Sequence, residues 1–442
     1  MTVALFGTFD VRNYGDALFP LLTRRRLQAL GEDLVLVSPV GGQPYLDALP
    51  SLGLEEFLRS APDLRAVLLG GGNILHASPL TDVYAGTASP GAAAYPSLWL
   101  GAVACARAQG APLLWNGPGI PVPLSPLAGG HLAHVARKAD YVSVRDPGSR
   151  EFLMATGISG DEPGTCDVHV VPDPAFELPR LFAPDALEAT FRQVCTSRGR
   201  DPDARWVALH ASPRRPQDTP SAVAEAFDAI ARRLEAAPLL LDIGPCHGDG
   251  RFLSEVAALM HEPAMVVEEP QRLQVVAACI HGSSAWLGAS MHGTITAAAY
   301  GVPFLHVPPS ADHKHRDLMG LLHSPGRLQS SWKAALNWLG RSALTTSRAM
   351  PHIQEQLVGG VDAHWDRLLH LLRTPCAPAS RPWPTSAASI LPPGLLLEML
   401  DTAMANRRGP PRRAHALRDA GRTAAGKTPI GRTDRPEETA AR

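Results

Sequence analysis

His292 is the residue of this chain best placed to transfer protons. It lies in the segment GASMHGTITAAAYGVPFLHV at 288–307, where a strand is expected to end at Ser290 and a helix of small residues to begin at Gly293. An imidazole in the first turn of a helix, facing a cleft, suits general acid or base chemistry near neutral pH. The spacing therefore predicts His292 as a catalytic residue. A single histidine in such a turn can also be structural.

Positive charges follow two other expected strands. Arg145 closes one buried run, and His210, Arg214 and Arg215 lie at and just beyond the end of another. Planar guanidinium groups in loops beside a cleft suit a phosphate or carboxylate ligand. Two plainer explanations stay open: an ion pair between Arg145 and the adjacent Asp146, and full solvation of the other two arginines. The pattern predicts an anionic substrate.

Lys314 lies between His313 and His315 in a further loop. The two imidazoles are two residues apart, and no fixed set of cysteines or carboxylates accompanies them, so the HKH sequence is not typical of a zinc site. The six cysteines form no CxxC pair and are predicted to be reduced thiols. We therefore expect no metal site and no disulfide framework.

Three glycine-containing loops follow expected strands in the first half of the chain. They are GTFDVRNYGDAL at 7–18, GGGN at 70–73 and NGPG at 116–119. Asn13 and Asp16 can cap the helix that follows, whose free N–H groups and dipole suit an anion. The glycine spacing matches neither the dinucleotide fingerprint nor the P-loop. Each loop alone could be an ordinary turn, but ligands bind at the carboxyl ends of strands in open α/β sheets, so together they predict a binding site.

Two consecutive sets of strands and helices must position these loops. Short apolar runs alternate with amphipathic segments, which is the pattern of a parallel sheet covered by helices. The predicted class is α/β, with two Rossmann-like domains facing a cleft. Strands are expected at 3–7, 34–38, 66–70, 112–116, 141–145, 169–174, 206–212, 239–245, 264–269, 285–290 and 303–308, and helices at 17–30, 147–156, 219–236, 252–261 and 293–300.

Changes in composition divide the chain into five parts. Prolines and a polar run separate the two halves, and no strand pattern follows residue 330. The last 36 residues carry ten Lys or Arg and almost no large apolar side chains, so they are predicted to be disordered. The parts are an N-terminal domain at 1–178, a linker at 179–204, a C-terminal domain at 205–330, a helical extension at 331–406 and a disordered basic tail at 407–442.

Composition excludes several classes of protein. Of the 442 residues, 41 are Lys or Arg and 42 are Asp or Glu, and the net charge of −1 gives no general attraction to nucleic acid. The two long uncharged stretches are interrupted by glycine, proline or histidine, and the N-terminus lacks the basic start of a signal peptide. We expect a cytoplasmic protein without a membrane span. Contact of the tail with anionic lipid and a homo-oligomer both stay open.

The ordered motifs resemble those of the polysaccharide pyruvyl transferase family. The resemblance spans roughly residues 1–320, and it rests on the whole set at these spacings because no single motif is diagnostic. The motifs are NYGDAL at 13–18, LLGGGNIL at 68–75, SVRDPGSREFL at 143–153, PDPAFEL at 172–178, and LGASMHGTITAAAYGVPFLHV at 287–307 followed by Lys314.

This resemblance implies a glycosyltransferase-B-like arrangement with the active site between the two domains. It implies a transferase that moves the enolpyruvyl group of phosphoenolpyruvate onto two hydroxyls of a sugar as a ketal and releases phosphate. Phosphoenolpyruvate is then a co-substrate, and no cofactor is needed. The acceptor would belong to a bacterial exopolysaccharide, to another cell-envelope glycan or to a lipid-linked precursor, which leaves peripheral membrane contact open.

The resemblance also implies roles for particular residues. His292 would transfer protons, and Arg145, Arg214 and the helix beginning at Gly293 would hold the anionic donor, with Lys314 beside them. Asn13, Asp16, Gly71 and Asn73 would line the acceptor side. The remaining candidates for substrate binding are Gly15, Gly72, Asn116, His210, Arg215 and Ser290.

One departure from the family pattern affects this interpretation. Many members have Arg-Leu-His where this chain has Ser290, Met291 and His292, so a contact to phosphate is missing. Either a neighbouring cation replaces the arginine, or donor binding is altered. Two other hypotheses remain: a nucleotide-sugar glycosyltransferase, in which Glu268 or Glu269 would hold the ribose, and a catalytically degenerate glycan-binding protein.

Overall fold

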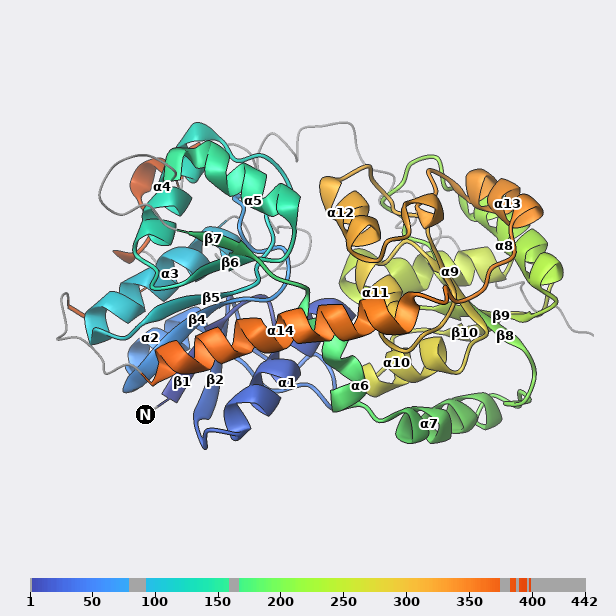
Figure 1. Ribbon diagram of the computed structural model, residues 1–442, viewed down its shortest axis with the longest axis horizontal. Helices are drawn as coiled ribbons and strands as arrows, with labels where there is room; N and C mark the ends of the chain where they lie inside the picture. The colour runs from blue at the N-terminus through green and yellow to red at the C-terminus, as the bar shows by residue number, and fades with distance from the viewer. Residues whose placement is uncertain are drawn as a thin grey trace, which may run out of the picture.

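The computed structural model describes residues 2–78, 93–158, 167–373 and parts of 382–398. Figure 1 shows two lobes side by side, each built around a sheet. The N-terminal lobe has a parallel five-stranded sheet in the order β3-β2-β1-β4-β5. Its strands are β1 (Thr2–Phe6), β2 (Asp33–Ser38), β3 (Leu52–Gly53), β4 (Leu64–Gly70) and β5 (Leu113–Asn116), and its helices are α1 (Tyr14–Gln28), α2 (Leu54–Ser60), α3 (Ala94–Gln109), α4 (Pro126–Arg137) and α5 (Pro147–Leu153).

A second, two-stranded sheet extends this lobe towards its neighbour. Strands β6 (Val142–Val144) and β7 (Val168–Val170) pair in parallel, and a bridge between Leu114 and Tyr141 joins them to β5. The chain then turns through the short helix η2 (Pro174–Glu177), so the predicted strand at 169–174 ends early. This extension carries Arg145 and Asp173 to the boundary between the lobes.

The C-terminal lobe repeats the plan of the first. Its sheet has the parallel order β10-β9-β8-β11-β12, which is the same order counted from its own first strand. The order reverses between β8 and β11, as it does between β1 and β4, and such switch points are where ligands bind. Its strands are β8 (Trp206–His210), β9 (Ala237–Leu241), β10 (Met265–Val267), β11 (Ala285–Gly288) and β12 (Phe304–His306), and its helices are α8 (Pro220–Leu234), α9 (Asp249–Ala257), α10 (Leu273–His281), α11 (Met291–Ala299) and α12 (His313–Leu321).

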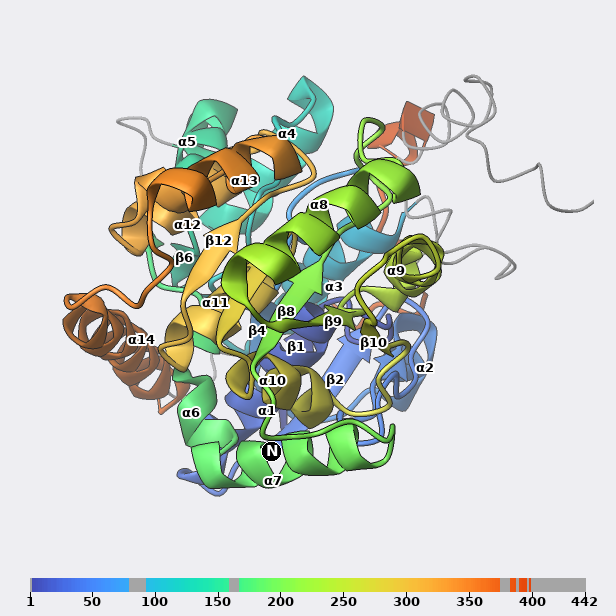
Figure 2. The same cartoon turned by 90° about the vertical axis from the view of Figure 1, so that its right-hand side faces the viewer.

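The segments outside the two predicted domains are parts of the lobes. The predicted linker contains most of α6 (Leu178–Leu181) and all of α7 (Pro184–Thr196), and α7 packs beneath α10, as Figure 2 shows. In the helical extension, α13 (Trp332–Arg341) packs on the C-terminal lobe. Helix α14 (Met350–Leu372) crosses both lobes (Figure 1): its first half joins the core around α10 and α11, and its second half covers β1 and β4.

The sequence pattern missed helix α3 because this helix has almost no polar face. In α3, 12 of 16 residues are buried, so the alternation that marks a surface helix is absent. Helix α1 begins three residues before its predicted start because Asn13 caps it, accepting a hydrogen bond from the Gly15 N–H at 3.1 Å. None of the helices in the described ranges is long and apolar enough to cross a membrane. Much of the predicted helical extension after residue 373, and all of the predicted tail, lie outside the described residues.

Candidate active site

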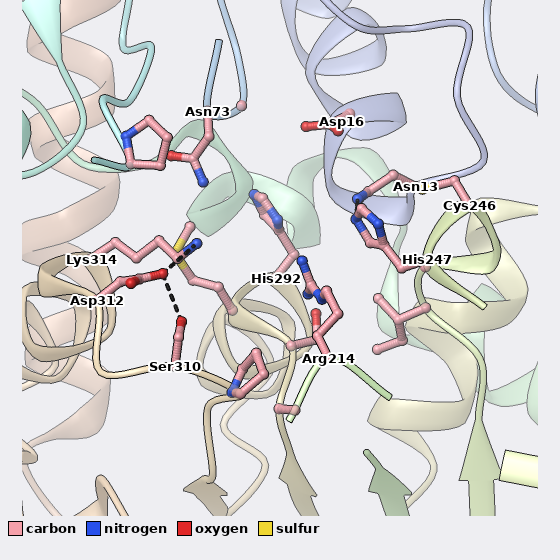
Figure 3. A pocket seen from close by; sticks show the side chains of 18 of the residues that line it. Asn13, Asp16, Asn73, Arg214, Cys246, His247, His292, Ser310, Asp312 and Lys314 are labelled. Atoms are coloured by element: carbon pink, nitrogen blue, oxygen red, sulfur yellow. Dashed lines mark hydrogen bonds and ion pairs between the residues drawn. The ribbon is translucent and has the colours of Figure 1, made fainter. Parts of the chain in front are cut away.

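A cavity of about 430 Å³ lies between the two lobes, at the switch points of both sheets. Loops after β1 and β4 line one side of it, and loops after β8, β9, β11 and β12 line the other. Figure 3 shows side chains from both lobes around it. The structure brings ten of the predicted site residues to this cavity: Asn13, Asp16, Gly72, Asn73, Arg145, His210, Arg214, Ser290, His292 and Lys314.

Three predicted glycines lie behind the cavity wall and shape it. A Cβ atom on Gly15 would overlap the ring of His292, so this glycine makes room for the imidazole. Gly71 has a φ of 85° and lies against Phe19, where a larger residue would be strained and would clash. A Cβ on Gly293 would overlap Trp286. These positions act through packing.

Two predicted substrate-binding residues do not line the cavity. Asn116 is buried, and its side chain hydrogen-bonds to His364 of α14 at 3.0 Å. Arg215 donates to the Ser330 carbonyl and lies 3.7 Å from Asp218, beside a separate cavity. The contacts with His364 and Ser330 join segments that are distant in sequence. The sequence of a loop does not show in which direction such a side chain points.

His292 lies beside a buried carboxylate of the opposite lobe. Its Nε2 is 3.5 Å from Asp173 Oδ2, and Arg145 lies 3.4 Å from the same oxygen. Burial raises the pKa of Asp173, but His292 and Arg145 outweigh this and hold it below the usual value. Sequence reasoning assigned Asp173 no role, although it lies in the PDPAFEL motif. Arg145 also donates to Asn73 Oδ1 at 2.5 Å, so its charge is engaged within the protein.

Asp16 is the second titratable group from the N-terminal lobe. Burial raises its pKa to about 6, despite the opposing effect of His292 and Arg145. Its Oδ1 lies directly over Gly72, where a Cβ would come within 2.5 Å of it. A carboxyl group with this pKa can hold a proton near neutral pH, which an ordinary aspartate does not.

The C-terminal lobe contributes two cations to the cavity. The Lys314 ammonium lies 3.5 Å from Asp312, which also accepts a hydrogen bond from Ser310, as the dashed lines in Figure 3 mark. Burial lowers the pKa of Lys314, and repulsion by Arg145 and Arg214 lowers it further. Arg214 donates to Ser212 Oγ at 3.2 Å, and within the described residues no carboxylate pairs with it. A guanidinium without a carboxylate partner, as in Arg214, suits an anionic ligand.

Ser290 has a structural role in this arrangement. Its hydroxyl accepts a hydrogen bond from the Gly293 N–H at 3.2 Å and so caps helix α11. The N–H group that was predicted to cradle an anion is therefore already bonded within the protein.

Several buried polar atoms around the cavity have no hydrogen-bond partner in the described part of the chain. Leaving such an atom unpaired costs about 1–3 kcal/mol, so their concentration here points to a ligand or to water that satisfies them. Two of these atoms, His210 Nδ1 and Asp249 Oδ1, belong to side chains that contact each other: His210 Nε2 lies 3.0 Å from Asp249 Oδ2. The atoms are Arg145 Nε, His210 Nδ1, Asp249 Oδ1, His292 Nε2 and His315 Nε2.

A group capable of holding a metal ion lies beside the cavity. Ligand atoms of Asp146, His313 and Asp317 are within 4.8 Å of one another. Each residue is engaged across the lobe boundary, since His313 lies 3.2 Å from Asp146 and Asp317 accepts from the Gly148 N–H at 2.9 Å. These contacts explain why the three side chains lie together: they join the start of α5 to α12.

A comparison with protein families gives a decisive match. A family model described as polysaccharide pyruvyl transferase matches residues 13–310. The chain belongs to the polysaccharide pyruvyl transferase family. The matched range includes every predicted site residue except Lys314. A comparison with curated protein sequences gave no match.

Three solved structures are similar to this pyruvyl transferase family member over most of its length. A glycosyltransferase from Rickettsia africae ESF-5 has a TM-score of 0.50 at 10% identity, covering 84% of this chain and 97% of that one. A UDP-N-acetylglucosamine 2-epimerase from Rickettsia bellii has a TM-score of 0.49 at 11% identity, covering 83% and 97%. The glycosyltransferase SnogD from Streptomyces nogalater has a TM-score of 0.43 at 16% identity, covering 84% and 99%. Similarity to the Rickettsia africae glycosyltransferase supports a glycosyltransferase-B-like fold for the two facing Rossmann-like lobes, and at 10% identity the likeness extends no further than the fold.

Proposed function

We propose that this protein transfers the enolpyruvyl group of phosphoenolpyruvate to two hydroxyls of a sugar, forming a ketal and releasing phosphate. The acceptor would be a sugar of a bacterial exopolysaccharide, another cell-envelope glycan or its lipid-linked precursor, and the reaction would take place in the cytoplasm. The observation that carries the donor assignment is that Lys314 and Arg214 line a cavity that also holds His292. Family membership supports the reaction class.

The chemistry makes demands that these residues can meet. C3 of the enol must gain a proton while positive charge develops at C2, where the first hydroxyl attacks. A second hydroxyl then displaces phosphate from C2. His292, held beside Asp173, is the proposed proton donor to C3. Lys314 and Arg214 are proposed to bind the phosphate and carboxylate groups of the donor. They would replace the arginine that many family members have where this chain has Ser290. Phosphoenolpyruvate is already activated, so the proposal includes no cofactor.

Asp16 and Asn73 are proposed to face the acceptor. Both lie in loops of the N-terminal lobe, across the cavity from Lys314 and Arg214 (Figure 3). A carboxyl and an amide offer the hydrogen bonds that sugar hydroxyls need. The two substrates would thus approach from opposite lobes and meet at His292.

Thermal-shift titration with phosphoenolpyruvate tests the donor assignment. A ligand at 100 times its dissociation constant adds about 2.7 kcal/mol to the free energy of unfolding, which raises the melting temperature by a few degrees. We expect this shift in the wild-type protein and its loss in Arg214→Ala. Arg215→Ala is the matched control, because the neighbouring arginine lies outside the cavity, and it should keep the shift.

UDP, GDP and CMP run in parallel test the main alternative. A shift with one of these nucleotides and none with phosphoenolpyruvate would favour a nucleotide-sugar glycosyltransferase. Stabilisation by phosphoenolpyruvate that leaves it unconsumed beside a bound acceptor would favour a degenerate glycan-binding protein. An equal loss of the shift in both arginine variants would remove the argument from the cavity cations.

A further inference from the structure

The proposed reaction needs a base as well as an acid, and the cavity holds two histidine–carboxylate pairs. One is His292 with Asp173. The other is His210, at the end of β8, with Asp249, at the start of α9, whereas His292 follows β11 across the switch point of the C-terminal sheet. We propose that His210 is the base that takes the proton from the attacking sugar hydroxyl, and that Asp249 orients it. This inference rests on the proposed function.

The geometry fixes which nitrogen of His210 is free. His210 is the last residue of β8 and Asp249 the first of α9, and both side chains are almost fully buried. Burial raises the pKa of Asp249, but His210 beside it brings the net pKa below the usual value, so the carboxylate is ionised. An ionised carboxylate can only accept, so the proton of a neutral His210 lies on Nε2. No described residue pairs with Nδ1, which is left as an acceptor, and the side chain lines the cavity.

The surrounding residues hold this pair in place. The imidazole lies nearly parallel to the indole of Trp286, with ring centroids 6.1 Å apart at 24°. A Cβ on Gly244 would come within 2.8 Å of Asp249 Oδ2, so the loop after β9 needs a glycine to admit the carboxylate. A base that is oriented in advance need not reorganise when the substrate binds.

The other cavity histidines are less suited to this role. His315 pairs with His306 at 2.8 Å, and burial lowers the pKa of His306 to about 3, so its partner is uncharged and does not stabilise an imidazolium. Burial lowers the pKa of His247 to about 4, and its side chain lies 3.4 Å from the Asn13 amide nitrogen. Among the described residues, His210 differs from His247 and His315 in having a carboxylate within hydrogen-bond distance of its ring.

The proton transfers balance over the two steps. In the first, the acceptor O–H bond breaks as the oxygen bonds to C2, the proton passes to His210 Nδ1, and C3 receives a proton from His292. In the second, the other hydroxyl bonds to C2 and the C2–O bond to phosphate breaks. The departing phosphate takes the proton from His210, and the proton of the second hydroxyl returns to His292. Both imidazoles regain their starting state, and no oxidant or reductant is involved.

Two variants separate the roles of the pair. His210→Gln removes the base, so phosphate release from phosphoenolpyruvate should fall at least about 100-fold, while the thermal shift with phosphoenolpyruvate stays. Asp249→Asn replaces the acceptor of the Nε2 proton with an amide, which can donate instead and move the proton to Nδ1. The phosphate-release assays would use methyl α- and β-glycosides of galactose, glucose and mannose as the sugar acceptors. His364→Gln and Asp228→Asn are matched controls, because both residues are buried and hydrogen-bonded away from the cavity.

The tautomer can be measured without any acceptor. Long-range ¹H–¹⁵N spectra of histidine-labelled protein, assigned with His210→Gln, should show Nδ1 of His210 unprotonated in the wild type and protonated in Asp249→Asn. A protonated Nδ1 in the wild type, or phosphate release within a few-fold of normal in His210→Gln, would overturn the proposal. Absence of phosphate release by the wild type with every acceptor would count against the proposed function, and the tautomer would still decide whether Asp249 sets His210 as a base.

Discussion

The N-terminal and C-terminal lobes have the same strand order and meet at equivalent switch points, yet they line the cavity with different side chains. The N-terminal lobe presents the amides of Asn13 and Asn73, the carboxyl group of Asp16 and the guanidinium of Arg145. The C-terminal lobe presents four of the five histidines, together with Lys314 and Arg214. One fold therefore serves two purposes, because the loops at the strand ends are free to differ while the sheets stay alike.

The difference shows that neither lobe holds a complete site. His292 belongs to α11 of the C-terminal lobe, but its carboxylate partner Asp173 and the ring of Phe19, 5.5 Å away between centroids, belong to the N-terminal lobe. Gly15 leaves the space in which the imidazole lies. The proposed acid is thus assembled only when the lobes are together.

Replacement of His292 should have the largest effect. His292→Gln removes the proposed donor to C3 and should lower phosphate release by about 10²–10⁴-fold. The thermal shift with phosphoenolpyruvate should persist, because the cations of the same lobe remain. Phosphate release that stays near the wild-type rate would show that the C-terminal lobe does not supply the acid, and Asp16 of the other lobe would become the candidate.

A single methyl group added to the N-terminal lobe should disturb the histidine of the C-terminal lobe. Gly15→Ala places a Cβ where the His292 ring lies, so the imidazole must move away from Asp173. Since small misplacements of a catalytic group cost about 10²-fold, we expect a loss of that size in phosphate release. Gly130→Ala is the control: that glycine lies inside α4 with open space around it, and its replacement should leave activity unchanged. Equal activity in both variants would mean that the lobes do not meet tightly at His292.

The similarity of the lobes was predictable from the sequence, and so was a cleft between them. Each of the eleven strands predicted from short apolar runs has an approximate counterpart in the structure, because buried parallel strands are continuous apolar segments. His292, Arg214 and Lys314 could be found because polar residues after a strand end mark a ligand site in this class.

The partners of these residues could not be predicted from the sequence. Asp173 lies 119 positions before His292, and Asp249 lies 39 after His210, so the pairs depend on how the lobes and loops pack. Asn116 followed the same strand-end rule but turns towards His364 of α14, a helix whose position across both lobes no local pattern encodes. Local chemistry was therefore accessible from the sequence, and long-range pairing was not.

Asp16 should make stability depend on pH through the N-terminal lobe. Its pKa of about 6 lies above the value near 4 of the unfolded chain, so the folded state binds the proton more tightly. Stability should fall as the pH rises from 4 to 6, and the ionised carboxyl should then cost about 1–3 kcal/mol. Asp16→Asn should accordingly raise the melting temperature by a few degrees at pH 8 and change it little at pH 4. A lower melting temperature at pH 8 would mean that the ionised form is satisfied in the fold.

The ion-pair network that joins α14 to the N-terminal lobe should have the smallest effect. Asp362 of α14 lies 2.5 Å from Arg26 and 2.6 Å from Arg180, and Arg26 also contacts the buried Glu177 at 2.6 Å. Hydrogen bonds from Arg180 and Arg26 hold the pKa of Asp362 below its usual value. Its contribution is therefore present above about pH 4 and is lost as the pH falls further.

Asp362→Asn should lower the melting temperature by about 1–3 °C at pH 7, because the side chain is 37% exposed and water screens the pair to ~0.5–1 kcal/mol. The difference from wild type should shrink towards pH 3. Asp366→Asn, one turn along the same helix and exposed, should leave the melting temperature unchanged at both pH values. An equal effect of the two substitutions would mean that the ion pairs add nothing, and that the apolar contacts of Val361, Trp365 and Leu368 alone fasten α14 across the lobes.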